Sequence, residues 1–220
     1  MTVTASPVPV AVAVDHRTTS RLLAAGIVAG PLFLGVGLAQ ASTRAGFDLD
    51  RHALSLLALG PLGFVQIAAF VVAGLLLVAA AVGMRRALGR GVGSVWGPRL
   101  LAGHGAGMVI AGLFVADPAD GFPVGTPVGP GEISWHGTLH GVGFAVAMIC
   151  WVSMVLVLAR RFAAHGERAR AAACVLALVG AAVVAASPQL GSLGVRLVLV
   201  SALQFAVVAA VCLRLARSTH

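Results

Sequence analysis

Two histidines, His136 and His140, are four residues apart at the start of a long apolar run. On an α-helix this spacing places both imidazoles on one face, about one turn from each other. Paired helical histidines can bind a metal ion through neutral imidazole nitrogens. No Glu stands between them, so the pair does not form the zinc-protease signature. The spacing indicates a candidate metal or proton-transfer site.

Other polar residues are expected on the same side of the protein. Asp117 ends the preceding apolar run, His52 lies in the first long polar loop, and Arg196 opens the last apolar run. His136, His140 and Asp117, with His52 as a further candidate, could hold a zinc ion with an open position for water.

The same polar residues allow two other interpretations. They could relay protons or line a path for a small solute, and Asp117 could pair with Arg196 to close the bundle. They could also be structural, because interfacial histidines bind loop carbonyls and an Asp-Pro pair often ends a helix. His104 is 13 residues before Asp117, about 20 Å away along a regular helix, and is not expected to join them.

The elements that position these residues are membrane helices. The chain of 220 residues is 59% hydrophobic and only 10% charged, and its mean hydropathy is +1.00. Soluble globular domains carry about a quarter charged residues, and disordered chains are more polar still. The composition therefore excludes both classes and predicts an integral membrane protein with the lipid bilayer as its partner.

Six apolar runs without charges are candidate membrane spans, because a spanning helix needs roughly 20 apolar residues. We predict an all-α, polytopic membrane helix bundle of six transmembrane helices over residues 20–215, after a flexible cytoplasmic tail over residues 1–19. The second run is long and contains Gly60 and Pro61, so its helix should begin near Leu62. The runs are Leu22–Thr43, Ala53–Met84, Leu100–Ala116, Ile133–Ala159, Ala171–Val195 and Leu197–Leu213.

The arginines predict the orientation of the bundle. All 15 basic residues are Arg, and they lie between the apolar runs rather than on one face, which argues against nucleic acid as a partner. Cytoplasmic loops retain an excess of Arg and Lys. With the N-terminus inside, 12 of the 15 arginines face the cytoplasm. We expect both termini to be cytoplasmic, in a multi-pass protein of the plasma membrane.

Three short motifs resemble the bacterial membrane family catalogued as domain of unknown function 998. They are Arg44-x-Gly46-Phe47-Asp48 followed by Ser55, Phe114-x-x-Asp117-Pro118, and His136-x-x-x-His140. The resemblance covers about residues 20–215. It implies a six-helix membrane protein without an established activity, common in actinobacteria, and the Lys-free, Arg-rich composition suits a high-GC genome of that kind.

A more distant likeness, to the alkaline ceramidase and adiponectin-receptor hydrolases, implies a catalytic role for Ser55. Together with Asp117, His136, His140 and His52, it would act around zinc on a lipid-like substrate. That group has seven helices and carries its paired histidines on the last, whereas this chain carries them on the fourth expected helix. A metal-dependent hydrolase is thus one hypothesis. A small-solute or proton-linked transporter and a structural or partner-binding protein are the others, and the oligomeric state stays open.

Overall fold

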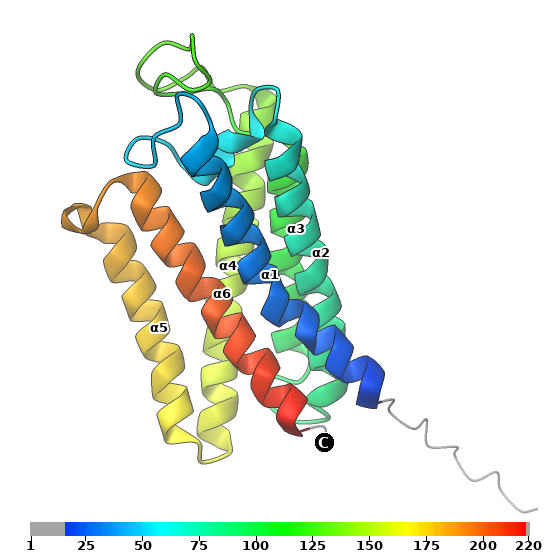
Figure 1. Ribbon diagram of the computed structural model, residues 1–220. Coiled ribbons are helices and arrows are strands. Elements are labelled where there is room, and N and C mark those ends of the chain that lie inside the picture. The colour runs from blue at the N-terminus through cyan, green and yellow to red at the C-terminus, as the bar shows by residue number, and fades with distance from the viewer. Residues whose placement is uncertain (1–15, 219–220) are drawn as a thin grey trace, which may run out of the picture.

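The structure of the protein is a computed structural model that describes residues 16–218 (Figure 1). Within this range the chain forms six α-helices and two short 3-10 helices, as an all-α bundle requires. Helices suit this sequence because in lipid each backbone polar group must be satisfied within its own segment. In chain order the elements are α1 (His16–Thr43), η1 (Leu54–Ala58), α2 (Gly63–Ala87), α3 (Trp96–Leu113), α4 (Trp135–Ala164), α5 (Arg168–Ala186), η2 (Pro188–Leu190) and α6 (Leu193–Ser218).

Successive helices run in opposite directions, so their connections gather at two ends of the bundle (Figure 1). Residues 44–62, 114–134 and 187–192 lie at one end, which we call the loop end. Residues 88–95 and 165–167 lie at the other, which we call the arginine end because 12 of the 15 arginines lie there. The loops thus divide between the two ends as their charge pattern predicts.

Five of the helices, α1, α2, α4, α5 and α6, are long and apolar enough to cross a membrane. The helix α3 is not among them, since its glycines, Arg99 and His104 lower its mean hydropathy. It packs between α2 and α4. The chain is therefore a multi-pass membrane protein in which α3 is enclosed by more apolar neighbours.

Glycines allow α3 to approach both neighbours closely. A Cβ atom on Gly105 would lie 2.5 Å from the carbonyl oxygen of Gly74 in α2, and one on Gly107 would lie 2.6 Å from that of Gly143 in α4. Small residues at helix crossings permit such close backbone contact in membranes. The glycines of α3 are thus intramolecular packing residues.

The helix α5 lies at the side of the bundle, against α4 and α6 (Figure 1). Its buried residues are Cys174 and Ala181, while long apolar side chains such as Leu176 are exposed. An exposed apolar helix surface is stable in lipid but not in water. This arrangement supports a bilayer as the surroundings of the protein.

The helix boundaries confirm part of the sequence prediction. The second helix begins at Gly63, with Leu62 as its N-cap residue, where a start near Leu62 is expected. Residues 1–15 of the expected tail lie outside the described residues, and residues 16–19 already belong to α1. The third helix ends at Leu113, so Asp117 lies in the following loop.

Candidate functional site

The side chain of His52 is hydrogen-bonded to two connections at the loop end, residues 44–62 and residues 114–134. It is buried, and its Nδ1 accepts a hydrogen bond from the backbone N–H of Asp48 at 2.9 Å. Its Nε2 lies 3.0 Å from the carbonyl oxygen of Asp120, so Nε2 carries the proton and donates. The rings of Phe47 and Phe122 pack beside the imidazole. Both ring nitrogens of His52 are therefore engaged by backbone.

The carboxylate of Asp117 lies at the N-terminus of α4. It accepts hydrogen bonds from the backbone N–H of Ser134 at 2.9 Å and from the Ser134 hydroxyl at 2.5 Å. The same hydroxyl oxygen accepts from the backbone N–H of Gly137, which caps the helix. A carboxylate is stabilised here by the unpaired N–H groups and the dipole of the helix.

The two histidines of α4 have different surroundings. His136 is exposed and stacks on the indole of Trp135, with ring centroids 3.5 Å apart. His140 is half-buried, and its Nδ1 lies 2.8 Å from the carbonyl oxygen of Ala111 and 3.1 Å from that of Phe114, near the end of α3. Carbonyl oxygens only accept, so Nδ1 of His140 carries the proton. The Nε2 atom then holds a lone pair and makes no hydrogen bond to residues 16–218.

His140 lines a cavity of about 390 Å³ near the loop end. The cavity is surrounded by residues from α1, α2, α3, α4, α6 and the short helix η1, and most of its wall is apolar. Phe33, Phe70 and Phe144 supply aromatic surface, and Phe70 meets the edge of the His140 ring at a centroid distance of 6.2 Å. An apolar cavity with a few polar groups is the usual form of a small-molecule site.

Ser55 and Ser201 contribute hydroxyl groups to the same cavity. Neither hydroxyl makes a hydrogen bond within the described part of the chain. The structure therefore brings together two of the sequence-predicted site residues, Ser55 and His140. It does not bring His136 to them, because that side chain is exposed on the outside of α4.

The residues at the loop end do not fit a zinc site. Within residues 16–218, no three His, Cys, Asp or Glu side chains are grouped so that they could hold a metal ion. Both nitrogens of His52 and one nitrogen of His140 are taken by backbone groups, and Asp117 is engaged by Ser134. We therefore derive no chemistry from a metal.

The ion pair between Asp117 and Arg196, one of the alternatives that the sequence leaves open, is not formed. The Arg196 guanidinium donates to the carbonyl oxygen of Ala185 at 2.6 Å, so it satisfies the end of α5 instead. Both ion pairs found within residues 16–218 involve Glu167, at the arginine end.

A buried pair of amides lies between α1 and α2. The Nε2 atom of Gln40 donates to Oε1 of Gln66 at 2.8 Å, and the other polar atom of each side chain has no partner in the described residues. Gln40 and Gln66 each lie in a charge-free run near the same end of the bundle, and this is the signal in the sequence for such a pair.

His104 lies apart from the loop-end residues, as its position in the sequence predicts. It is buried in α3 and its Nδ1 donates to the carbonyl oxygen of Ala147 in α4 at 3.0 Å. Its Nε2 is buried without a partner among residues 16–218.

Comparison with known proteins gives one match. The family model described as protein of unknown function (DUF998) matches residues 27–214, which is most of the chain. No curated protein and no solved structure matches it.

Proposed function

This chain belongs to the DUF998 family of proteins of unknown function, and from that premise we propose that it binds a lipid-like ligand in the His140 cavity. The ligand has an apolar body and a hydroxyl group. The observation that carries the proposal is the tautomer of His140, whose Nδ1–H is held by Ala111 and Phe114 while Nε2 remains an acceptor. An acceptor in an apolar cavity selects a donor, and a hydroxyl is the donor common among uncharged lipids.

The depth of His140 suits an amphiphilic ligand. The helix α4 has 30 residues and is about 45 Å long, which exceeds the roughly 30 Å of the hydrocarbon layer. His140 is five residues, or about 7.5 Å, from its start at Trp135, which corresponds to the boundary between headgroups and hydrocarbon. A ligand hydroxyl at this level would leave the apolar body in the hydrocarbon.

The cavity can be reached from the bilayer side. Phe144 of α4 and Leu193 of α6 line it, and their side chains are 49% and 61% exposed. Both side chains lie at the surface, so a lipid-like molecule could enter between α4 and α6 at this level.

The proposal includes six membrane crossings with both termini in the cytoplasm. The arginine excess at one end supports the orientation. The packing of α3 between α2 and α4 supports a sixth crossing, because a helix enclosed by two spans traverses the same depth. The bilayer we propose is the plasma membrane.

The experiment compares His140→Asn with His140→Phe in purified protein. The Asn amide takes the place of Nδ1 and can still donate to the α3 carbonyls, but it lacks Nε2. We expect a medium-chain 1-alkanol to stabilise wild type against heat more than the alkane of equal length. His140→Asn should keep the basal stability and weaken alkanol binding roughly fivefold, the loss of one hydrogen bond of about 1 kcal/mol. His140→Phe should lose both the basal stability and the alkanol binding.

His136→Asn is the matched control, since it makes the same change one turn away on an exposed position. It should bind the alkanol as wild type does. Equal alkanol binding by wild type and His140→Asn would disprove the proposed hydrogen bond.

A second candidate function is hydrolysis of a lipid ester, favoured by Ser55 and His140 lining one cavity. A serine beside a histidine base whose other nitrogen is held by a third group is the arrangement used for nucleophilic catalysis. Ser55→Ala should then abolish hydrolysis of a medium-chain ester while alkanol binding persists. No hydrolysis by wild type would exclude this candidate and leave ligand binding untouched. A transport role has less support, because Asp117 is engaged by Ser134, the N-cap residue of α4.

A further inference from the structure

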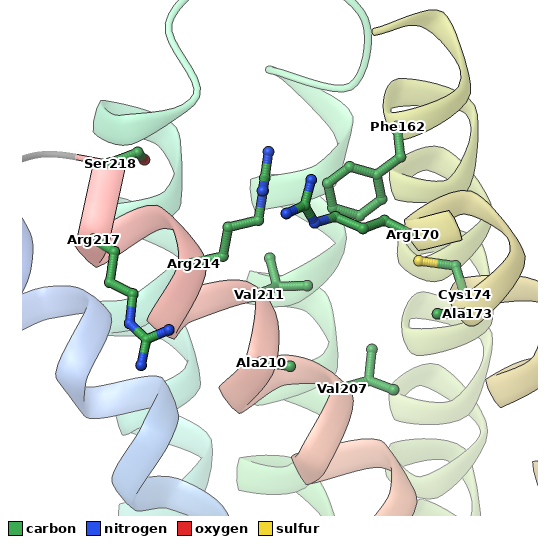
Figure 2. A pocket seen from close by; sticks show the side chains of 10 residues that line it. All are labelled: Phe162, Arg170, Ala173, Cys174, Val207, Ala210, Val211, Arg214, Arg217 and Ser218. Carbon is green, nitrogen blue, oxygen red and sulfur yellow. The ribbon is translucent and has the colours of Figure 1, made fainter. Parts of the chain in front are cut away.

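A cavity of about 530 Å³ lies between α5 and α6 at the arginine end, far from the His140 cavity (Figure 2). Three arginines, Arg170 of α5 and Arg214 and Arg217 of α6, line it. Figure 2 shows Arg170 and Arg214 extending toward each other across the gap between the two helices, with the ring of Phe162 beside them. Nothing in the proposed function uses these residues.

Glu167 orients two of these arginines. Its Oε2 accepts from Arg170 at 2.6 Å and its Oε1 accepts from Arg214 at 2.5 Å. The Arg214 guanidinium also lies over the Phe162 ring, 5.6 Å from its centroid. Arg217 is exposed and has no partner in the described part of the chain. Among residues 16–218, one carboxylate against three guanidinium groups leaves two positive charges uncompensated at the cavity.

The donors of these arginines are only partly used. Each guanidinium has five N–H donors in a planar fork, and Glu167 takes one from each of Arg170 and Arg214. The remaining donors match the oxygens of a phosphate, which arginine binds in a bidentate manner.

The rest of the cavity wall is apolar. Cys174, Val207 and Val211 line it on the side nearer the middle of the bundle, as Figure 2 shows. A free phosphate ion would gain nothing from this surface, whereas an acyl chain would be buried against it. The wall therefore favours a ligand with a charged end and an apolar tail.

The depth of the arginines agrees with a headgroup position. Arg196 and Arg214 are 18 residues apart on α6, a distance of about 27 Å along the helix. This is close to the roughly 30 Å thickness of the hydrocarbon layer. Arg214 consequently lies at the level of the lipid phosphates when Arg196 lies at the opposite boundary.

We infer that this cavity is a binding site for an anionic phospholipid. The phosphate is bound by Arg170 and Arg214, Arg217 adds positive charge at the rim of the cavity, and one acyl chain lies along Cys174, Val207 and Val211. Basic pockets between membrane helices select anionic headgroups in this manner. A zwitterionic lipid carries a cation beside its phosphate and is disfavoured by the two uncompensated positive charges.

The test uses purified full-length protein and phosphatidylglycerol with a photoreactive group in its acyl chain, with crosslinked peptides identified by mass spectrometry. We expect crosslinks in the segments of α5 and α6 that contain Cys174 and Val211. Unlabelled phosphatidylglycerol should compete, while phosphatidylcholine and inorganic phosphate should not. Competition by inorganic phosphate would identify the site as one for the free ion and overturn the inference.

Two variants separate charge from the apolar wall. The double variant Arg170→Gln with Arg214→Gln should reduce these crosslinks at least about tenfold, because two charge-assisted contacts are lost. Ala210→Phe keeps every arginine and fills part of the cavity, so it should reduce them as well. The second variant tests the site even if the first does not fold.

Arg168→Gln is the matched control, since it removes an exposed arginine from the same turn of α5 that does not line the cavity. It should leave the crosslinks unchanged. Crosslinks in the cavity between α2 and α3, which Arg85, Arg86 and Arg99 line, provide an internal reference. An equal decrease in all three variants, or no decrease in the double variant, would disprove the site.

Discussion

The Asp117 carboxylate holds Ser134 with both oxygens, one through the Ser134 hydroxyl at 2.5 Å and one through its backbone N–H at 2.9 Å. These two residues are 17 positions apart, near opposite ends of the connection between α3 and α4. Nearby, His140 ties α4 to the last carbonyls of α3. Two side chains thus join the end of one helix to the start of the next, and the position of His140 in its cavity depends on this junction.

Replacing Asp117 should loosen this junction. Asp117→Ala removes both acceptors from the start of α4, and we expect the free energy of unfolding in detergent to fall by about 1–2 kcal/mol. Asp117→Asn retains one acceptor and should lose less. Glu132→Gln, an exposed carboxylate in the same loop, serves as the control and should have little effect. Equal stability of wild type and Asp117→Ala would show that the junction is not stabilising.

Gly137 should not tolerate a side chain. A Cβ atom there would overlap with Oδ2 of Asp117, so Gly137→Ala must displace the carboxylate and should destabilise the protein by roughly 1–3 kcal/mol. Gly141 lies one turn further on the same helix, where a Cβ would meet nothing within 4 Å. Gly141→Ala should therefore be neutral or stabilising by up to about 1 kcal/mol. Thermal unfolding of both variants, measured side by side, checks this contrast.

The crossing of α3 and α4 should be sensitive to side-chain size at Gly107. A Cβ on Gly107 would lie 2.6 Å from the backbone nitrogen of Ala147, so Gly107→Val forces the helices apart. We expect a loss of at least about 1–3 kcal/mol, measured by unfolding in mixed micelles. In α1, a Cβ atom on Gly35 would meet nothing within 4 Å, so Gly35→Val is a control that makes the same substitution without a clash. A larger loss for the control would contradict the packing seen between α3 and α4.

Glu167 should make stability depend on acidic pH. Desolvation acts to raise the pKa of Glu167, but the hydrogen bond from Arg170 and the charges of Arg214, Arg170 and His165 outweigh it and lower the pKa from its ordinary value of 4.5. The interactions of the ionised Glu167 therefore contribute fully to the free energy of unfolding above pH 4.5. This contribution is lost as the pH falls through the lowered pKa of Glu167.

Glu167→Gln removes this titration. The difference in melting temperature between wild type and Glu167→Gln should be largest near neutral pH and should shrink as the pH falls below 4.5. If the difference in melting temperature grew on acidification, the pKa of Glu167 would not be lowered in the folded protein.

The sequence predicts the helices better than the contacts between them. Long apolar runs indicate spans because lipid leaves the backbone few alternatives, and family membership is confirmed. The helix α3 is harder to predict, because its glycines and His104 lower its hydropathy and its place depends on α2 and α4.

The candidate site could be predicted only in part. The spacing of His136 and His140 places them on one helix, but the partners that distinguish them are distant in sequence, 29 residues from His140 in the case of Ala111. His52 is likewise bound by Asp120, 68 residues away. Such pairings depend on the tertiary fold, which no local pattern reveals. The actinobacterial origin suggested by composition stays a prediction.

Three basic side chains at the loop end bind neutral carbonyl oxygens rather than carboxylates. Arg44 donates to the carbonyl oxygen of Leu59, and Arg51 and His52 both donate to that of Asp120. The ion pairs of residues 16–218 lie at the opposite end. Dissolved salt screens attraction between exposed charges but has little effect on a bond to a carbonyl. The conformation of these loop-end contacts should therefore change little between low and high salt concentrations.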